Sequence, residues 1–231
     1  MRNIHRLAAL AALAALTVAL TACGGTQPTT SDMAPGAQQP APAAPSMAPV
    51  PAPAAAGAGI TEISDIFGPG CSQVPTSGEG SAQGMVDDPV ATAASNNPLL
   101  STLVTAVGAV PGLADTLNSQ EAITVYAPSN DAFEEVRQAI GDDAFQALLA
   151  DPDQLGTLLS YHVVPQRYDA EQLVDAGRST ELAGGQVTIG GTADAPILTS
   201  GDGTEANVLC GNIPTANATV FVIDKVLMPA G

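Results

Sequence analysis

The chain has 231 residues, of which 45% are hydrophobic but only 3% are aromatic, and its formal net charge is -17 at pH 7. A core must therefore consist mainly of small aliphatic side chains. The 6 basic residues against 23 acidic ones exclude the usual electrostatic binding of nucleic acid and of anionic membrane surfaces. Three cysteines are too few for a disulfide scaffold and cannot all pair within one chain.

Residues 1–22 have the pattern of a signal peptide. Arg2 and Arg6 form a positive start, and the apolar run over residues 7–22 is short for a membrane span but typical of a signal sequence. The run ends in Leu20-Thr21-Ala22-Cys23, which resembles the lipobox of bacterial lipoproteins, where the cysteine thiol receives a diacylglyceryl group. We therefore predict that Cys23 is lipidated and anchors the exported protein to the bacterial cell membrane. The alternatives are an ordinary secretory signal and an uncleaved signal anchor.

Residues 23–59 are the predicted tether, which starts at the lipidated cysteine. Positions 24–58 contain 8 of the 19 prolines and a single charge, Asp32, so this stretch cannot bury enough apolar surface to fold. Repeated proline also prevents a helix, and the expected conformation is a disordered, semi-extended spacer that presents the domain at the cell surface. A ligand for a proline-binding domain is the alternative interpretation.

Residues 60–231 form one predicted domain, and the first half of it carries helix signals. These signals are polar caps followed by proline or by an apolar stripe, with glycine at the end of two stripes, at Gly108 and Gly141. The predicted helices start after Asp88-Pro89, after Asn97-Pro98, at Ser129 or Asn130, near Phe145 and after Asp151-Pro152.

Strand signals flank these helices and fill the last part of the chain. They are short β-rich runs, and the later ones are separated by glycine, aspartate and asparagine, which favours antiparallel hairpins. The predicted strands cover residues 123–126, 161–164, 187–189, 197–199, 207–209 and 220–223. Helices in one half and strands in the other indicate an α+β fold.

Two cysteines remain when Cys23 is assigned to lipid. The signal peptide places Cys71 and Cys210 in an oxidising compartment, where such a pair is expected to close. A redox-active pair is the less favoured alternative because the C-x-x-C spacing is missing. A structural bridge would close a loop of well over a hundred residues. By lowering the entropy of the unfolded chain, it would stabilise the folded state by about 5 kcal/mol.

Three stretches together resemble the conserved boxes of the fasciclin (FAS1) family. They are Thr124-Val125-Tyr126-Ala127-Pro128-Ser129-Asn130-Asp131-Ala132-Phe133, then Tyr161-His162-Val163-Val164, then the stretch from Ala218-Thr219-Val220-Phe221 to Leu227-Met228-Pro229. Their order fits one complete copy over residues 88–229, and further segments such as Gly68-Pro69-Gly70-Cys71 are similar to actinobacterial surface antigens of this family. The resemblance implies an antiparallel β-sandwich or wedge wrapped by several short helices. It also implies the Cys71–Cys210 bridge and candidate binding residues Tyr161, His162 and Asp224.

The chain offers little that would support catalysis. After removal of the signal, His162 is the single histidine, and a lone histidine in an apolar run is more often a hydrogen-bonded core residue. No second histidine or free cysteine accompanies it at metal-ligand spacing, and the sequence contains neither G-x-S-x-G nor a phosphate-binding loop. We therefore expect no cofactor, no metal and no enzymatic activity.

Three functional hypotheses follow from these features. The leading one is a lipid-anchored adhesion or binding module at the cell surface, with an extracellular protein, glycan or lipid as its partner. The second is a carrier of a small apolar ligand such as a lipid or glycolipid, because an aromatic-poor core of small aliphatic residues can leave a cavity between helices and sheet. The third is a secreted hydrolase that uses His162.

Overall fold

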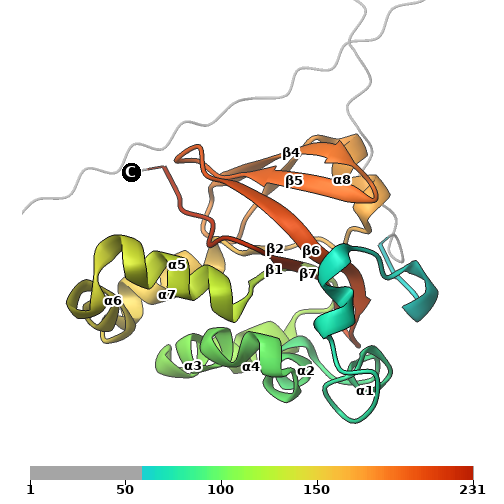
Figure 1. Ribbon diagram of the computed structural model, residues 1–231, viewed down its shortest axis with the longest axis horizontal. Coiled ribbons are helices and arrows are strands. Elements are labelled where there is room, and N and C mark those ends of the chain that lie inside the picture. The colour runs from blue at the N-terminus through green and yellow to red at the C-terminus, as the bar shows by residue number, and fades with distance from the viewer. Residues whose placement is uncertain (1–58, 231) are drawn as a thin grey trace, which may run out of the picture. The chain divides into compact units, whose positions relative to one another are not determined.

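The structure, a computed structural model, describes residues 59–230 (Figure 1), so the predicted signal peptide, Cys23 and the tether up to residue 58 lie outside the described residues. Within this range most helices precede most strands, in agreement with an α+β chain. The helices are α1 (Ala82–Met85), α2 (Val90–Asn96), α3 (Ser101–Ala109), α4 (Leu113–Ser119), α5 (Asn130–Ile140), α6 (Asp142–Leu149), α7 (Pro152–Ser160) and α8 (Ala170–Ala176), and single 3-10 turns cover Ile63–Asp65, Pro69–Gln73 and Pro98–Leu100.

The helix ends follow from local capping chemistry. The Ser129 side chain accepts a hydrogen bond from the backbone N–H of Ala132 at the start of α5, and Gly141 ends that helix with φ 87°. Asp151 caps α7 in the same way, ahead of Pro152. Two expected ends differ slightly: Pro89, with no side-chain cap, precedes α2, and α3 continues through Gly108 to Ala109.

Three helices and one strand have no counterpart among the sequence predictions, and the first of these helices, α1, is only four residues long. Helix α4 follows Gly112, whose φ is 77°, and α8 begins with a capping box in which Asp169 and Gln172 bond to each other's backbone N–H groups. Strand β3 (Arg178–Thr180) comes directly after α8 and is only three residues long. Short elements of this kind carry too little hydrophobic periodicity to stand out.

Seven strands of the described chain form one sheet in the order β2-β1-β7-β6-β5-β4-β3. Their bounds are β1 (Ile123–Pro128), β2 (Val163–Val164), β3, β4 (Gln186–Thr192), β5 (Ala195–Thr199), β6 (Glu205–Pro214) and β7 (Ala218–Ile223). The late strands pair antiparallel with their sequence neighbours, as the hairpin signals predict. Strand β2 is shorter than predicted because Tyr161 still caps α7 and His162 lies in the following turn.

One strand pair departs from the antiparallel pattern. Strands β1 and β7 run parallel, with Ile123 opposite Ala218 and Pro128 opposite Ile223. Every residue of both strands is buried, which is typical of strands covered on both faces. A parallel pair needs a long connection in place of a hairpin, and here α5–α8 and the β3–β6 meander separate β7 from β1.

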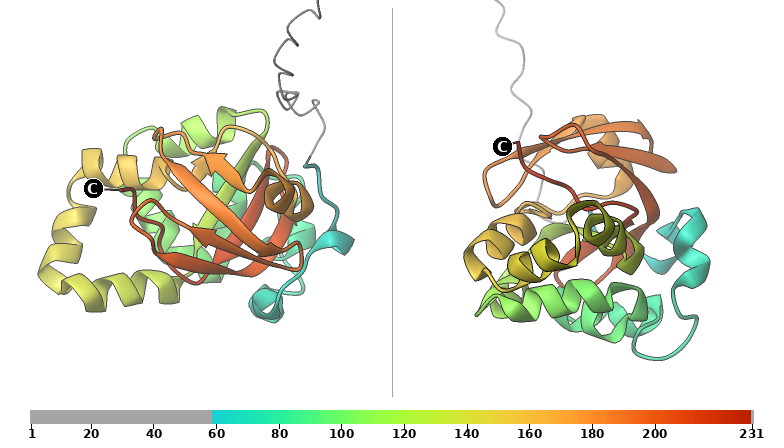
Figure 2. Two further views of the ribbon diagram at one scale, coloured as in Figure 1. Left: turned by 90° about the horizontal axis from the view of Figure 1, so that it is seen from above. Right: turned by 60° about the vertical axis from the view of Figure 1, so that its left-hand side comes forward.

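Side chains of β1 and β7 alternate between two cores, one on each side of the strand pair. Ile123, Val125, Val220 and Val222 face a larger core shared with helices α2–α7. Tyr126, Phe221 and Ile223 face a second core that β4, β5, β6 and α8 close. Figures 1 and 2 show this division, with α2–α7 gathered on one side and β4, β5 and α8 on the other.

The first described residues are fastened to the central sheet. The Gly59 carbonyl accepts a hydrogen bond of 2.6 Å from the Thr219 hydroxyl on β7. Arg167 donates to the same hydroxyl and to the carbonyls of Thr215 and Ala218. Gly59 has φ 78°, and a Cβ there would meet the Arg167 backbone at 2.5 Å, so the entry to the domain requires glycine.

Candidate functional site

The predicted disulfide is present. Cys71, in the 3-10 turn after Phe67, is bonded to Cys210 on β6, and their Cα atoms lie 4.9 Å apart. Phe67 also forms an isolated antiparallel bridge with Gly211, next to Cys210. The bridge and the backbone pair together hold the segment around Phe67 and Cys71 against β6.

His162 lies inside the protein with both ring nitrogens engaged. Nε2 accepts a hydrogen bond from the Leu227 N–H at 3.0 Å, so Nδ1 carries the proton and donates to the Leu158 carbonyl at 2.8 Å. Burial lowers the pKa of His162 to about 4, and the ring is therefore neutral at physiological pH. A ring in this state has no free nitrogen for proton transfer, which removes the basis for the hydrolase hypothesis.

Tyr161 is also buried, and its hydroxyl is fully used. The hydroxyl donates to the Gln186 carbonyl and accepts from the Gly201 N–H, both at 2.9 Å. With only 1% and 2% of their surfaces exposed, Tyr161 and His162 cannot be reached by a partner at the surface. The hypothesis that these two side chains form a surface contact is therefore corrected: they stabilise the fold.

Asp224 is half-buried and orders the end of β7. Its carboxylate accepts hydrogen bonds from the N–H and the side-chain amide of Asn207, at 2.7 and 2.8 Å. It therefore helps to fix the pairing of β6 with β7. The three candidate binding residues do not form one exposed patch.

An apolar cavity of about 280 Å³, partly open to solvent, lies between α2, α3 and α4 on one side and β1 on the other. Its floor contains Val125, Leu159 and His162, all buried, while Thr92 and Ser95 lie exposed at its mouth. None of the described residues that line it is charged. The low aromatic content predicted a hollow between helices and sheet, but the sequence did not indicate which residues would surround it.

A buried polar cluster lies on the opposite side of β1. The Tyr126 and Ser179 hydroxyl oxygens are 3.0 Å apart, and the Ser179 hydroxyl donates to Oε1 of Glu181 at 2.6 Å. The other oxygen, Oε2, is buried without a hydrogen-bond partner among the described residues. Burial raises the pKa of the Glu181 carboxyl to about 7. The sequence did not indicate this cluster, because Glu181 stands next to a glycine-containing turn that looks solvated.

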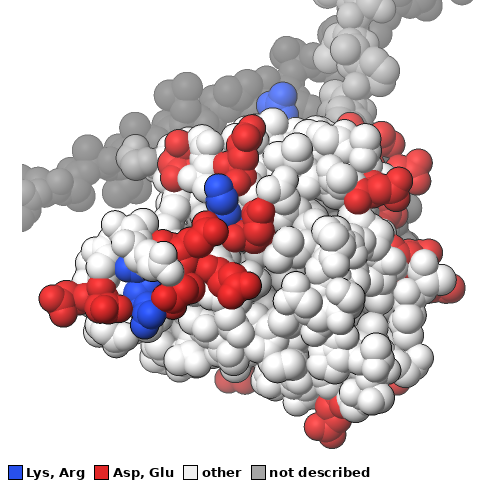
Figure 3. Space-filling model, viewed as in Figure 1, with Lys and Arg blue, Asp and Glu red and all other residues white. Residues whose placement is uncertain are grey.

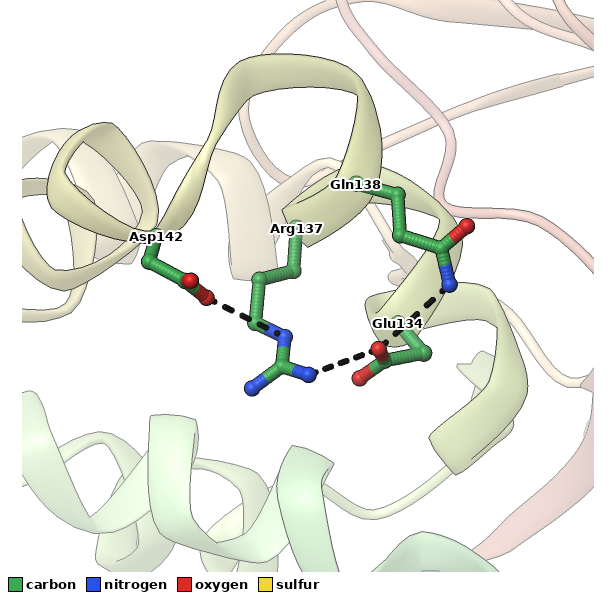
Figure 4. Close-up of polar contacts among 4 residues, drawn as sticks. All are labelled: Glu134, Arg137, Gln138 and Asp142. Atoms are coloured by element: carbon green, nitrogen blue, oxygen red, sulfur yellow. Dashed lines mark hydrogen bonds and ion pairs between the residues drawn. The ribbon is translucent and has the colours of Figure 1, made fainter.

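Acidic side chains dominate the surface. The described chain has four basic residues against 22 acidic ones, and Figure 3 shows red side chains gathered over α5 and α6. Arg137 is placed between two of them, 2.7 Å from Glu134 and 3.5 Å from Asp142 (Figure 4). These side chains are about half exposed or more, so the pairs add little to stability.

Two further tests concern metals and membranes. Within residues 59–230 no group of three or more histidine, cysteine or acidic side chains is arranged to hold a metal ion. In the same range no single helix is long and apolar enough to cross a membrane. The helical stretches Pro98–Ala109 and Leu113–Ser119, bent by 109° relative to each other, reach that length and hydropathy only when taken together.

Comparison with known proteins decides the family. The fasciclin domain model matches residues 98–229, which is more than half of the chain and includes β1, β2 and β7. The chain belongs to the fasciclin family. Its fold is that of a FAS1 domain pair from the insect cell adhesion molecule fasciclin I, with a TM-score of 0.54 and 16% identity over 63% of this chain and 52% of that one. The chain thus matches about half of that two-domain structure.

Curated relatives of this fasciclin protein come from mycobacteria. The cell surface glycolipoprotein MPB83 of Mycobacterium bovis is 39% identical over 96% of this chain and 95% of its own length. The immunogenic protein MPB70 of the same species is 42% identical over 71% of this chain and 83% of its own length. These relatives carry surface and antigen names rather than enzymatic ones.

Proposed function

We propose that this fasciclin protein is exported, is held at the bacterial cell surface by lipid on Cys23, and acts there as a non-enzymatic adhesion or binding module. The observation that carries the proposal is the alignment with MPB83, a cell surface glycolipoprotein by name, over 96% of this chain. An alignment of that extent reaches the amino-terminal region that contains Leu20-Thr21-Ala22-Cys23. The engaged nitrogens of His162 support the non-enzymatic part.

The anchor is tested by metabolic labelling of the full chain in a bacterial host with an alkyne analogue of palmitate. The wild-type chain is expected to carry label and to sediment with membranes. The Cys23→Ala variant is expected to carry none, and Thr21→Ser, which keeps a small residue beside the cysteine, should behave as wild type. A wild-type chain without label, or a labelled Cys23→Ala variant, would contradict the anchor.

The binding role is tested with the full-length Cys23→Ala chain, which lacks the proposed lipidation site. Immobilised matrix proteins, receptor ectodomains and cell-wall glycans are screened for saturable binding, each at low and high salt. Because the described domain is strongly acidic, binding to a basic partner should weaken as salt rises. The absence of any saturable partner would overturn the adhesion module but would not affect the anchor.

The apolar cavity favours a second candidate function, a carrier of a small apolar ligand. Cavities of this kind, with apolar walls and few polar groups, are the usual binding sites of small molecules. Native mass spectrometry of the full chain purified from its host is expected to show a bound apolar compound that organic solvent releases. Protein of unmodified mass in every preparation would contradict this candidate.

A further inference from the structure

Hydrogen bonds beside the apolar cavity fix the positions of the helices that form its walls. Oδ1 of Asn118, on α4, accepts a hydrogen bond of 2.9 Å from the Ala91 N–H in α2. Oδ1 of Asn217, in the turn between β6 and β7, accepts one of the same length from the Val90 N–H, and its Nδ2 donates to the Leu117 carbonyl at 2.8 Å. The start of α2 and the end of α4 are therefore fixed to the sheet, and the cavity exists before any ligand arrives.

The chemistry of the lining selects an uncharged, apolar occupant. Its walls are aliphatic side chains, and small residues such as Ala94, Gly108 and Ala114 leave the room that larger ones would fill. The most polar group in the floor is the His162 ring, and both of its nitrogens are hydrogen-bonded to backbone groups. A charged group placed inside would find no counter-charge and would lose its hydration.

The size of the cavity limits how much of a ligand can enter. An apolar cavity of about 150 Å³ accepts benzene, and this one is larger, about 280 Å³. If each methylene group takes about 30 Å³, the share of volume of one water molecule, the cavity holds roughly nine carbons of a chain. A second, small void of about 30 Å³ shares the lining residues Ala94 and Leu103 with it. A longer ligand would have to extend through the mouth.

We propose that this cavity binds the terminal part of one fatty-acyl chain of an uncharged lipid, whose head group remains outside at a polar rim formed by Thr92, Ser95 and Asn118. The rim residues carry hydroxyl and amide groups without charge. The excess of acidic side chains on the described domain repels a carboxylate or phosphate head group and so favours a neutral ester. The inference rests on the carrier function proposed above and gives it a site and a ligand class.

The test measures binding of monoacylglycerols of increasing chain length to the full-length Cys23→Ala chain by titration calorimetry, below their critical micelle concentrations. Affinity should rise about fourfold for each added methylene while the chain is still filling the cavity, and should level off near ten carbons. Decanoate should bind more weakly than monodecanoylglycerol. Affinity that does not depend on chain length, or that is higher for decanoate, would overturn the proposal.

Two glycine variants locate the site. Gly108 is an exposed residue of α3 at the edge of the cavity, and a Cβ at this position meets no atom within 4 Å, so Gly108→Leu adds a side chain beside the cavity without a clash. Gly190, on exposed β4, has the same open surroundings and provides the control Gly190→Leu. We expect Gly108→Leu to lower monodecanoylglycerol affinity by about tenfold or more while melting as high as the parent, since glycine is a poor helix former. Gly190→Leu should bind as the parent does.

The outcomes separate this inference from the carrier function. If native mass spectrometry finds an apolar ligand and Gly108→Leu retains it at unchanged affinity, the protein is a carrier but the site is wrong. If neither the purified chain nor the monoacylglycerol titration shows an apolar ligand, both fail. Equal losses in Gly108→Leu and Gly190→Leu would also overturn the assignment, because the effect would then not be local.

Discussion

Replacing Glu181 by glutamine should change how the stability of the protein depends on pH. The side chain is 2% exposed, its carboxylate accepts a hydrogen bond from the Ser179 hydroxyl, and no cation of the described chain is among the groups that shift its pKa; Tyr126 and Tyr161 are the titratable groups near it. Burial raises its pKa from 4.5 to about 7. Between these two values the folded protein holds a proton that the unfolded chain releases, so the folded state loses stability as pH rises through this window.

The size of the effect follows from the shift. At about 1.4 kcal/mol for each pKa unit, the full cost of ionising Glu181 in the folded state is about 3 to 4 kcal/mol. Local relaxation and entering water reduce it, and we expect about 2 kcal/mol. Glu181→Gln removes the titration, so the variant should be more stable than wild type at about pH 8 and gain nothing at about pH 4.5.

Urea unfolding with the disulfide intact, repeated across this pH range, measures the difference. The variant must be compared with wild type at each pH, because His162 also makes the free energy of unfolding depend on pH, and with the opposite sign. Its pKa falls from 6.5 to about 4 on folding, so its share of stability is present above about pH 6.5 and is lost as pH falls toward 4. Glu135→Gln, at an exposed position on α5, is the control. Parallel stability curves for wild type and Glu181→Gln would refute the reasoning.

Three further changes test other parts of the structure. Cys71→Ala with Cys210→Ala should cost about 4 to 5 kcal/mol in urea unfolding, because the loop they close is long, and an unchanged stability would contradict a structural role. His162→Ala should cost about 3 kcal/mol, since two buried backbone groups lose their partner and a cavity opens; melting temperatures equal to wild type would contradict it. Arg137→Gln should leave the melting temperature unchanged, because its ion pairs are exposed, and a clear loss would show that Figure 4 depicts a stabilising network.

Much of the fold was predictable because its signals are local. Ser129 and Asp151 cap helices by bonding to N–H groups two or three residues away, and sequence spacing reveals such contacts directly. The conserved boxes located β1 and β7 for the same reason. Helix α8 could also have been found, since Asp169 and Gln172 have capping-box spacing. Its seven residues are too few to show a helical repeat of apolar side chains.

The candidate site was less predictable because it depends on contacts between distant segments. The cavity keeps its shape through Asn217, which bonds to Val90 at a separation of 127 residues. Nothing in the local sequence distinguishes that asparagine from the polar turns around it. The resemblance to the family made Tyr161 and His162 candidate contact residues, whereas their side chains bond to Gln186, Gly201 and Leu227, all distant in sequence.

The fastening of residues 59–71 has a mechanical consequence if the protein is anchored as proposed. A pull that arrives along the tether first meets the Gly59–Thr219 hydrogen bond and then, after the segment to Cys71, the covalent link to Cys210. Only this short amino-terminal segment can peel away before tension crosses the sulfur bridge into β6. Helices α1–α8 lie between the two cysteines in sequence, inside the closed loop and away from that load path. The cavity that they enclose would keep its shape while the cell is under shear.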